Sequence, residues 1–204
     1  MGNLPNFDHE LACYQQGYRR VSGLDEVGRG ALAGPVVAAA VILPQQGYPK
    51  GINDSKKLSA RQRELLYDPI LSCALDYGIG QSSAQEIDQI NIRQATFLAM
   101  QRALQQLKNP ADFLLIDGRD PLPVSMSMST PQQCLVGGDA YCLSIAAASI
   151  IAKVYRDRWM MDMNQADPRY DFARHKGYGT QAHRNLIKQH GPSPLHRQSF
   201  AGVV

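Results

Sequence analysis

Four acidic side chains stand at the ends of apolar runs, close to glycine or other small residues: Asp25, Glu26, Asp117 and Asp139. Open α/β sheets build their sites at strand ends, so these carboxylates converge if the strands that carry them are neighbours. Carboxylates a few ångströms apart repel one another, and bound divalent cations relieve that repulsion. Oxygen-only ligands suit Mg²⁺ or Mn²⁺, whereas the four cysteines are not spaced like the ligands of a zinc site.

Two such cations, about 4 Å apart, can activate water, hold a phosphodiester and stabilise the leaving oxygen. The pattern therefore predicts hydrolytic phosphoryl transfer. A lone acidic residue at a strand end more often caps a turn, so the prediction depends on all four residues together. Because successive side chains of a strand point to opposite faces, Asp25 and Glu26 can face one site only if the strand bends there. Gly28 and Gly30 make such a bend possible.

Hydrophobic periodicity and capping signals indicate the elements that must position these carboxylates. Strands are expected at residues 18–25, 35–43, 77–81, 113–116 and 134–136, and helices at residues 59–75, 84–107, 143–163 and 181–189. The run VVAAAVIL in the second strand does not alternate, which predicts burial on both faces. Ser59 with Gln62, and Ser83 with Glu86, have the spacing of capping boxes. Alternating strands and helices predict an α/β sheet with helices packed on it.

Length and composition set the limits of the fold. With 204 residues, 44% of them hydrophobic, the chain predicts one domain over residues 1–204, with a polar segment at 1–16 and a basic segment from about 165 to 204. The longest uncharged helical stretch, residues 143–152, is about half as long as a membrane-spanning helix. The N-terminus does not resemble a signal peptide. These features predict a cytoplasmic protein with reduced, buried cysteines and no membrane contact.

The net charge is only +3, but no acidic residue follows Asp171, while five lysines or arginines do. A tail of one sign suits a polyanionic partner, and a solvated basic face is the equally open alternative.

Six sequence blocks resemble, in the same order, the motif series of the bacterial ribonuclease HII family. They are GLDEVGRGALAGPVVAAAVIL, NDSKKL, LLIDG, GGDAYCLSIAAASIIAKVYRDRWM, HKGYGTQAH and GPSPLHRQSF, and they span residues 23–200. The resemblance implies a ribonuclease H-like mixed central sheet flanked by helices, with a helical C-terminal extension. It also implies an endonuclease that uses two divalent cations, Mg²⁺ or Mn²⁺, and we expect the protein to be a monomer. The implied substrates are RNA–DNA hybrids and duplex DNA with embedded ribonucleotides, cut 5′ to the ribonucleotide to leave a 3′-hydroxyl and a 5′-phosphate.

The resemblance also assigns roles to individual residues. Asp25, Glu26, Asp117 and Asp139 match the family's metal ligands. Gly28, Arg29 and Gly30 match the loop that reads the ribonucleotide 2′-hydroxyl, the group that distinguishes RNA from DNA, and Tyr178 matches the tyrosine that packs against the next sugar. Ser55 and Lys56 match contacts to backbone phosphates, which position a duplex without reading its sequence. Weaker candidates for the same contacts are Asp54, Lys57, Lys153, Arg156, His183, Arg184 and Arg197.

The chain departs from the family pattern around Asp139. Gly137, Tyr141 and Cys142 stand where lysine and serine are commoner, which affects the expected strength of substrate binding and leaves the metal ligands intact. Two alternatives remain open at this stage. One is another two-metal nuclease of the same fold class, such as a resolvase or exonuclease, and the other is a hybrid-binding module without activity.

Overall fold

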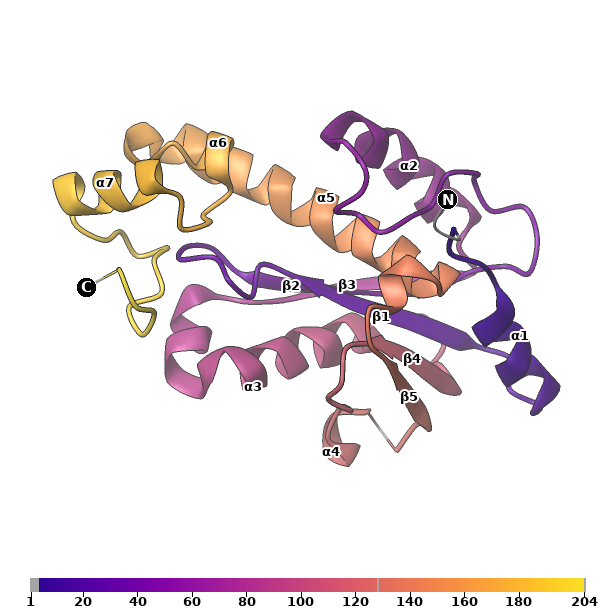
Figure 1. The fold of residues 1–204 in the computed structure, drawn as a ribbon. Helices are drawn as coiled ribbons and strands as arrows, with labels where there is room; N and C mark the ends of the chain where they lie inside the picture. Colours follow the sequence, from indigo (N-terminus) through magenta and orange to yellow (C-terminus); the bar gives the residue numbers. More distant parts are fainter. Residues whose placement is uncertain (1–3, 128, 204) are drawn as a thin grey trace.

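A five-stranded mixed sheet with the strand order β3-β2-β1-β4-β5 forms the centre of the computed structural model, which describes residues 4–127 and 129–203 (Figure 1). The strands are β1 (Val21–Val27), β2 (Val36–Ile42), β3 (Asp76–Ser82), β4 (Phe113–Asp117) and β5 (Gln132–Leu135). β2 pairs antiparallel with β1 and β3, while β4 pairs parallel with β1 and β5. Every residue of β2 is buried, as the unalternating apolar run predicts. The expected mixed sheet flanked by helices is confirmed.

Helices cover both faces of this sheet. On one face, α2 (Ala60–Cys73) and α5 (Leu143–Ala166) pack against the residues of β2 that include Val37 and Ala39. On the other face, α3 (Ala84–Gln105) packs against Ala38 and Ala40. Figure 1 shows α5 and α3 on opposite sides of the strands. Both predicted capping boxes are present, at the starts of α2 and α3.

Close contact between α5 and β1 depends on glycine. A Cβ atom at Gly23 would lie 2.2 Å from the carbonyl carbon of Ser144, so a larger residue would push the helix off the strand. The alanines near the start of α5 are fully buried against the sheet. The helix therefore begins directly above the strand that carries Asp25.

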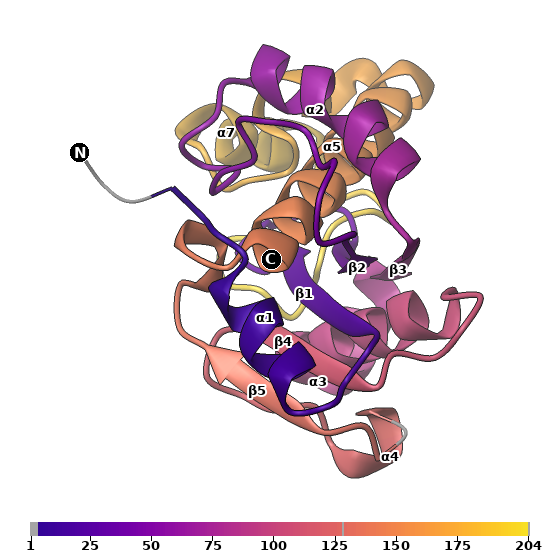
Figure 2. The same ribbon diagram turned by 90° about the vertical axis from the view of Figure 1, so that its right-hand side faces the viewer.

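Two local features were not expected from periodicity. Helix α1 (Asp8–Gln15) lies in the segment described above only as polar, and the buried Glu10 accepts a hydrogen bond of 2.7 Å from the backbone N–H of Ser144 at the start of α5. Figure 2 shows α1 beside that end of α5. α3 is also interrupted, since Asn91 has φ 65° and its side chain accepts hydrogen bonds from the N–H groups of Arg93 and Gln94. The single helix predicted over residues 84–107 is therefore two helical segments.

The remaining short elements are α4 (Val124–Ser127), η1 (Gly138–Ala140), η2 (Pro168–Tyr170), α6 (Phe172–His175) and α7 (Gln181–His190). The segments that follow α6 and α7 return to the loop between β1 and β2, through bridges that pair Ala31 with Tyr178 and Ala33 with His196. Within the described residues, no helix is both long and apolar enough to cross a membrane.

Candidate active site

Three carboxylates meet at one end of the sheet. Asp25 is in β1, Asp117 ends the adjacent strand β4, and Asp139 lies in the η1 turn that follows β5. One oxygen of each lies within 4.8 Å of one oxygen of each of the others. Asp25 and Asp139 are each only 4% exposed. Strand order explains the convergence, because β1, β4 and β5 are consecutive neighbours in the sheet and run parallel.

Glycine backbone fixes the turn that carries Asp139. Gly137 adopts a left-handed conformation with φ 68°, which favours glycine. The N–H of Gly138 donates a hydrogen bond of 2.7 Å to Oδ1 of Asp117, and a Cβ atom there would lie 2.7 Å from Cδ1 of Ile145. The turn therefore both orients Asp117 and brings Asp139 toward it.

The concentration of negative charge changes the acidity of these groups. Burial, together with the charges of Glu26, Asp117 and Asp139, raises the pKa of Asp25 well above its usual value. Burial and the charge of Asp139 likewise raise the pKa of Asp117. A site that disfavours its own ionised carboxylates in this way gains free energy when a cation binds.

Glu26 does not join this group of three. It pairs with Ala38, on the face covered by α3, whereas Asp25 pairs with Ala39, on the face covered by α5. β1 continues through Val27, so successive side chains alternate between the two faces of the sheet up to that residue, and Gly28, with φ 93°, is the first residue after the strand. Glu26 instead lies close to Arg29, with 3.4 Å between Oε1 and Nη1. Three of the four expected carboxylates thus lie within 4.8 Å of one another, while Glu26 lines the same pocket as Asp25 and its charge raises the pKa of Asp25.

A pocket of about 280 Å³ opens beside the carboxylates and gathers residues from distant parts of the chain. Its lining includes Asp25, Glu26, Ser55, Lys56, Lys153 and Tyr178. The Lys153 ammonium lies 5.6 Å from the centre of the Tyr178 ring. The structure therefore places Asp25 and Glu26, two residues of the DSKKL segment and Tyr178 of the KGYGT turn around one opening.

Two further residues of this pocket were not identified as site residues from the sequence. Arg63 lines it and donates hydrogen bonds to the carbonyls of Ser55 and Leu58, at 2.7 and 2.5 Å. Ser149 lines it from α5 and donates to Oγ of Ser55 at 2.7 Å. Ser55 is itself only 6% exposed, so its hydroxyl is held by Ser149 at the wall of the pocket. Ser149 lies within one of the family-like blocks, but nothing in the sequence shows that it or Arg63 faces the pocket, because that depends on α2 and α5 packing together.

The loop after β1 carries the expected sugar-reading residues. Gly28 is buried, and a Cβ atom there would lie 2.3 Å from Nε of Arg156. Gly30 is exposed, and a Cβ atom there would meet nothing within 4 Å. Glycine is therefore needed at the two positions for different reasons. At Gly28 a side chain would collide with Arg156 inside the protein, while at Gly30 the lack of a side chain leaves the outer surface of the loop open.

Three of the basic candidates for phosphate contact are not at the surface. Arg156, Arg197 and His183 are each 0% exposed, and their nitrogens bond to neighbouring protein groups. Sequence reasoning took them for surface cations because their charge alone does not reveal what surrounds them. The expected direct phosphate contacts are therefore corrected for these three residues.

The other weaker candidates differ in their surroundings. Arg184 is half-buried and donates to the carbonyl of Gly179 at 3.2 Å, and Lys153 pairs with Asp157 at 2.8 Å. Asp54 accepts a hydrogen bond from the N–H of Lys56 at 2.9 Å, so it shapes the turn that presents Lys56. The exposed Lys57 lies 4.0 Å from the Asp54 carboxylate.

The structure shows where the three residues that depart from the family pattern near Asp139 lie. Gly137 is exposed in its left-handed turn, and the Tyr141 hydroxyl donates to the carbonyl of Val136 at 3.1 Å. Cys142 is 0% exposed and its thiol contacts Glu10, so a residue at this position contributes no side chain to the surface.

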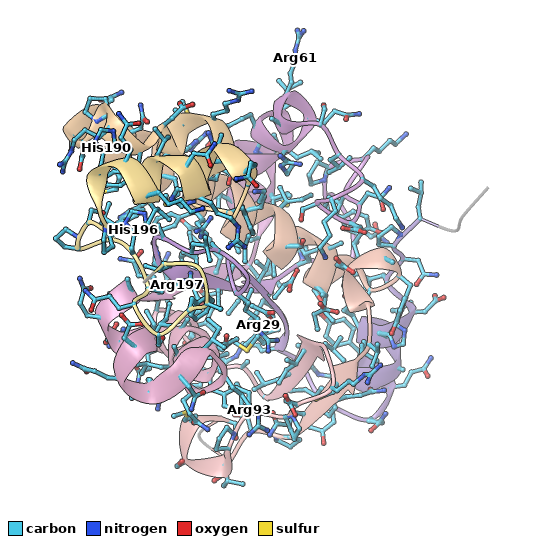
Figure 3. All side chains as sticks on the ribbon, turned by 60° about the vertical axis from the view of Figure 1, so that its left-hand side comes forward. Arg29, Arg61, Arg93, His190, His196 and Arg197 are labelled. Carbon is cyan, nitrogen blue, oxygen red and sulfur yellow. The ribbon has the colours of Figure 1, made fainter. Side chains whose placement is uncertain are left out.

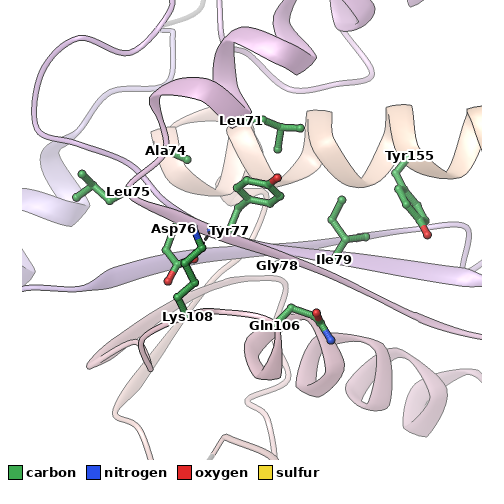
Figure 4. A pocket seen from close by; sticks show the side chains of 10 residues that line it. All are labelled: Leu71, Ala74, Leu75, Asp76, Tyr77, Gly78, Ile79, Gln106, Lys108 and Tyr155. Carbon is green, nitrogen blue, oxygen red and sulfur yellow. Dashed lines mark hydrogen bonds between the residues drawn. The ribbon is translucent and has the colours of Figure 1, made fainter.

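A larger pocket of about 480 Å³ lies elsewhere, along the outer edge of β3 between the ends of α2 and α3 (Figure 4). Its carboxylate, Asp76, accepts hydrogen bonds from the N–H groups of Tyr77 and Asn109, at 3.0 and 3.1 Å. These bonds give Asp76 a structural role. The chemistry predicted from the sequence therefore belongs to the smaller pocket.

Comparison with known proteins decides the family. The family model for ribonuclease HII matches residues 22–203. The chain belongs to the ribonuclease HII family. The ribonuclease HII of Syntrophotalea carbinolica is 57% identical over 197 residues, which make up 97% of this chain and 91% of that protein. That of Geobacillus kaustophilus is 50% identical over 200 residues, 98% of this chain and 74% of that protein.

Solved structures agree with this family and with the fold. The crystal structure of the ribonuclease H2 from Pyrococcus horikoshii OT3 matches with a TM-score of 0.74 and 25% identity, over 91% of this chain and 95% of that chain. As a ribonuclease HII, the protein is a hydrolase and an endonuclease of the ribonuclease H type. Enzymes of this kind depend on metal ions and act on nucleic acids that contain RNA, and the three clustered carboxylates agree with the metal requirement. The resemblance drawn from the motifs is confirmed.

Proposed function

We propose that this endonuclease cuts the phosphodiester bond on the 5′ side of a ribonucleotide, both in RNA–DNA hybrids and in duplex DNA with embedded ribonucleotides. The observation that carries the proposal is the cluster of Asp25, Asp117 and Asp139 within 4.8 Å of one another, beside a pocket that Lys56 and Tyr178 also line. The cluster supplies a place for cations, and the pocket supplies groups suited to a phosphate and a sugar.

The donor set fits two hard divalent cations, Mg²⁺ or Mn²⁺. All donors of the cluster are carboxylate oxygens, the ligands that these ions prefer. In the proposal Asp25, Asp117 and Asp139 hold the ions together with Glu26, which lines the same pocket as Asp25. When bound, such a pair activates water and neutralises the charge that develops on a phosphodiester.

The protein's own groups bind and orient the nucleic acid. The exposed Lys56 ammonium and the Lys153 ammonium can each approach a phosphate oxygen from the pocket rim, and the Tyr178 ring offers a flat apolar surface to a sugar. The backbone around Gly30 has no side chain in the way, so a ribose can approach its N–H and C=O groups closely. A 2′-hydroxyl can both donate to and accept from such groups, which gives a physical basis for selecting RNA.

The proposed reaction is a hydrolysis whose atoms balance simply. A water oxygen forms a bond to the phosphorus, and the bond between phosphorus and the upstream O3′ breaks. The water loses a proton and the departing O3′ gains one, so the products are a 3′-hydroxyl and a 5′-phosphate on the ribonucleotide.

Cleavage of three matched duplexes tests the proposal. One carries a single ribonucleotide, one is a continuous RNA–DNA hybrid and one is DNA only, and each is incubated with Mg²⁺, with Mn²⁺ or with a chelator. The proposal expects metal-dependent cutting of the first two, at the 5′ side of a ribonucleotide, and no cutting of the third. Equal cutting of the DNA-only duplex, or cutting in the chelator, would refute it.

A further inference from the structure

Two fully buried arginines hold the loop between β1 and β2 in place. Arg156 comes from α5 and Arg197 from the C-terminal segment, and both are 0% exposed. The loop spans residues 28–35 and includes the three residues that the proposed function uses to read the 2′-hydroxyl. Figure 3 labels Arg197 and Arg29, which meet at this loop although 168 residues separate them.

Arg197 binds the loop at two carbonyl groups. Its Nη1 donates to the carbonyl of Arg29 at 2.9 Å, inside the sugar-reading turn itself. Its Nε and Nη2 both donate to the carbonyl of Gly34, at 3.0 and 2.9 Å. The planar, forked guanidinium therefore fixes the separation between the two ends of the loop, which a lysine ammonium has no equivalent geometry to do.

Arg156 joins the same loop to the turn that carries Tyr178. Its Nε and Nη2 donate to the carbonyls of Pro35 and Ala33, at 2.8 and 3.0 Å, while its Nη1 donates to the carbonyl of Lys176 at 2.9 Å. The guanidinium carbon lies 5.4 Å from the centre of the Tyr178 ring. One side chain thus contacts both elements to which the proposed function assigns sugar recognition.

Both cations are bound without a carboxylate. Within the described residues, their hydrogen bonds go only to backbone carbonyls, and Asp88, whose charge raises the pKa of Arg197, is itself hydrogen-bonded to Gln198 and Ser199. Burying a charge without a partner of opposite sign is costly, and apolar side chains would pack a loop more cheaply. Such an arrangement indicates a requirement for fixed geometry rather than for stability alone.

The loop has no room to shift while these contacts hold. The N–H of Leu32 donates to the carbonyl of Gly177 at 2.8 Å, and Ala31 pairs with Tyr178. A Cβ atom at Gly177 would lie 2.3 Å from the carbonyl oxygen of Ala33. The backbone of the loop and the backbone of the Tyr178 turn are therefore in direct contact, and a displacement of one moves the other.

We propose that Arg197 is a specificity-determining positioning residue, which acts by holding the Arg29 carbonyl and not by touching a phosphate. Arg156 does the same for the far end of the loop and for Tyr178. The inference rests on the proposed function, because it is the reading of the 2′-hydroxyl that the fixed loop serves. It replaces the phosphate contacts expected from sequence with an indirect role in substrate choice.

Arg197→Lys tests this role, because it keeps the charge and removes the forked hydrogen bonds. The measurement is kcat and KM on a duplex with one ribonucleotide and on the same duplex with a 2′-fluoro nucleotide at that position. We expect kcat on the ribonucleotide to fall by about tenfold to a hundredfold, as for misplacement of a reacting group. KM should change by less than about threefold, since the phosphate contacts remain. The preference for the 2′-hydroxyl should fall by about tenfold, and this ratio is independent of how much enzyme is folded.

Arg102→Lys is the matched control. Arg102 also donates to a backbone carbonyl, that of Gln81 at 2.7 Å, and bonds to Glu86 instead of to the loop. This variant should keep the wild-type ratio. Salt dependence of Arg197→Gln, which removes the charge, separates the two roles of Arg197: loss of a direct phosphate contact lowers the slope of log Kd against log salt by about 1, whereas the proposal expects an unchanged slope.

Amide hydrogen exchange of the substrate-free protein gives a readout that does not need activity. In Arg197→Lys, the amides of residues 31–34 should exchange faster while those of β1 and β2 stay protected. Arg156→Lys serves the same purpose if Arg197→Lys does not fold. Wild-type discrimination in folded Arg197→Lys, or a slope reduced by about 1 in Arg197→Gln, would overturn the proposal. If the wild-type enzyme itself ignores the 2′-hydroxyl, the proposed function fails instead, whatever the exchange data show.

Discussion

The ammonium of Lys56 lies 2.9 Å from Oδ2 of Asp139, although the two residues are 83 positions apart. Burial lowers the pKa of Lys56, but the hydrogen bond and charge of Asp139 outweigh this and leave its pKa raised. A side-chain cation therefore occupies the edge of the carboxylate cluster. It partly compensates the negative charge there, and it competes with any metal ion that uses the same oxygen.

Replacing Lys56 with methionine should consequently have opposite effects on metal and on substrate. The dissociation constant for Mn²⁺ should tighten by about threefold to tenfold, in line with an exposed ion pair worth about 1 kcal/mol. Duplex binding should weaken, and its salt slope should fall by about 1. Calorimetric titration with Mn²⁺ and duplex binding at several salt concentrations measure both effects. Lys50→Met, at an exposed position away from the cluster, is the control and should change neither.

Asp117→Asn should abolish cleavage and stabilise the metal-free protein. Loss of a metal ligand removes several kcal/mol of transition-state stabilisation, a decrease in rate of about a thousandfold or more. The pKa of Asp117 is raised in the fold, so at neutral pH its ionised form opposes folding when no metal is bound. The melting temperature without metal should therefore rise, and the further rise on adding Mg²⁺ should shrink. Near-native cleavage by this variant would contradict the site.

The two glycines of the sugar-reading loop should respond differently to alanine. Gly28→Ala places a Cβ atom 2.3 Å from Nε of Arg156, at a residue with φ 93°, so we expect a loss of about 1–3 kcal/mol in the free energy of unfolding. Gly30→Ala meets open space and should melt like the wild type. Its cleavage of a single-ribonucleotide duplex should nevertheless decrease, because the new methyl group stands where the ribose approaches. Unchanged cleavage by Gly30→Ala would contradict the proposal that the ribose approaches the backbone closely at Gly30.

A buried histidine network beneath Tyr178 should make the fold sensitive to acid. Nδ1 of His183 lies 3.0 Å from the carbonyl of Tyr178, so we assign the proton to that nitrogen. Nε2 of His183 then accepts from Nε2 of His196 at 3.1 Å, and Nδ1 of His196 accepts from the N–H of Ser193. His175 stacks on His183 with 4.1 Å between ring centres. Every nitrogen of the central pair has a partner only while both rings are neutral.

Burial lowers the pKa of His183 and of His196 to about 4, and the neighbouring positive charges of His175 and Arg184 lower that of His183 further. The histidines of the unfolded chain have a pKa near 6.5, so between pH 6.5 and pH 4 the unfolded chain binds more protons than the folded protein. The stability that the two neutral rings contribute is therefore fully present above pH 6.5 and is lost as the pH falls toward 4. The loss is roughly 3 kcal/mol for each ring. Melting temperatures from pH 7 to pH 4 should fall more steeply for the wild type than for His196→Gln. The raised pKa of Asp25 changes stability with pH in the opposite direction, but it does so equally in both proteins, so the comparison removes its effect. Equal slopes would contradict the network.

The sequence by itself determined most of the local structure and the type of chemistry. Capping boxes located the starts of α2 and α3, and the unalternating run of β2 indicated a strand buried on both faces. Asp25, Asp117 and Asp139 could be identified because each follows an apolar run, a pattern that depends on residues adjacent in the chain. Helix α1 had no such pattern, and it owes its position to Glu10 at the start of α5.

Only the tertiary structure decided which of these side chains meet. Whether Glu26 points toward Asp25 or away from it depends on where β1 ends and how it pairs with β2, and pairing involves residues far apart in the chain. The same reason explains Arg197: its charge is visible in the sequence, but its burial against the Arg29 carbonyl exists only once the C-terminal segment packs on the loop. Local periodicity describes a residue's own element, whereas burial and the partners of a charge are set by the elements that pack against it.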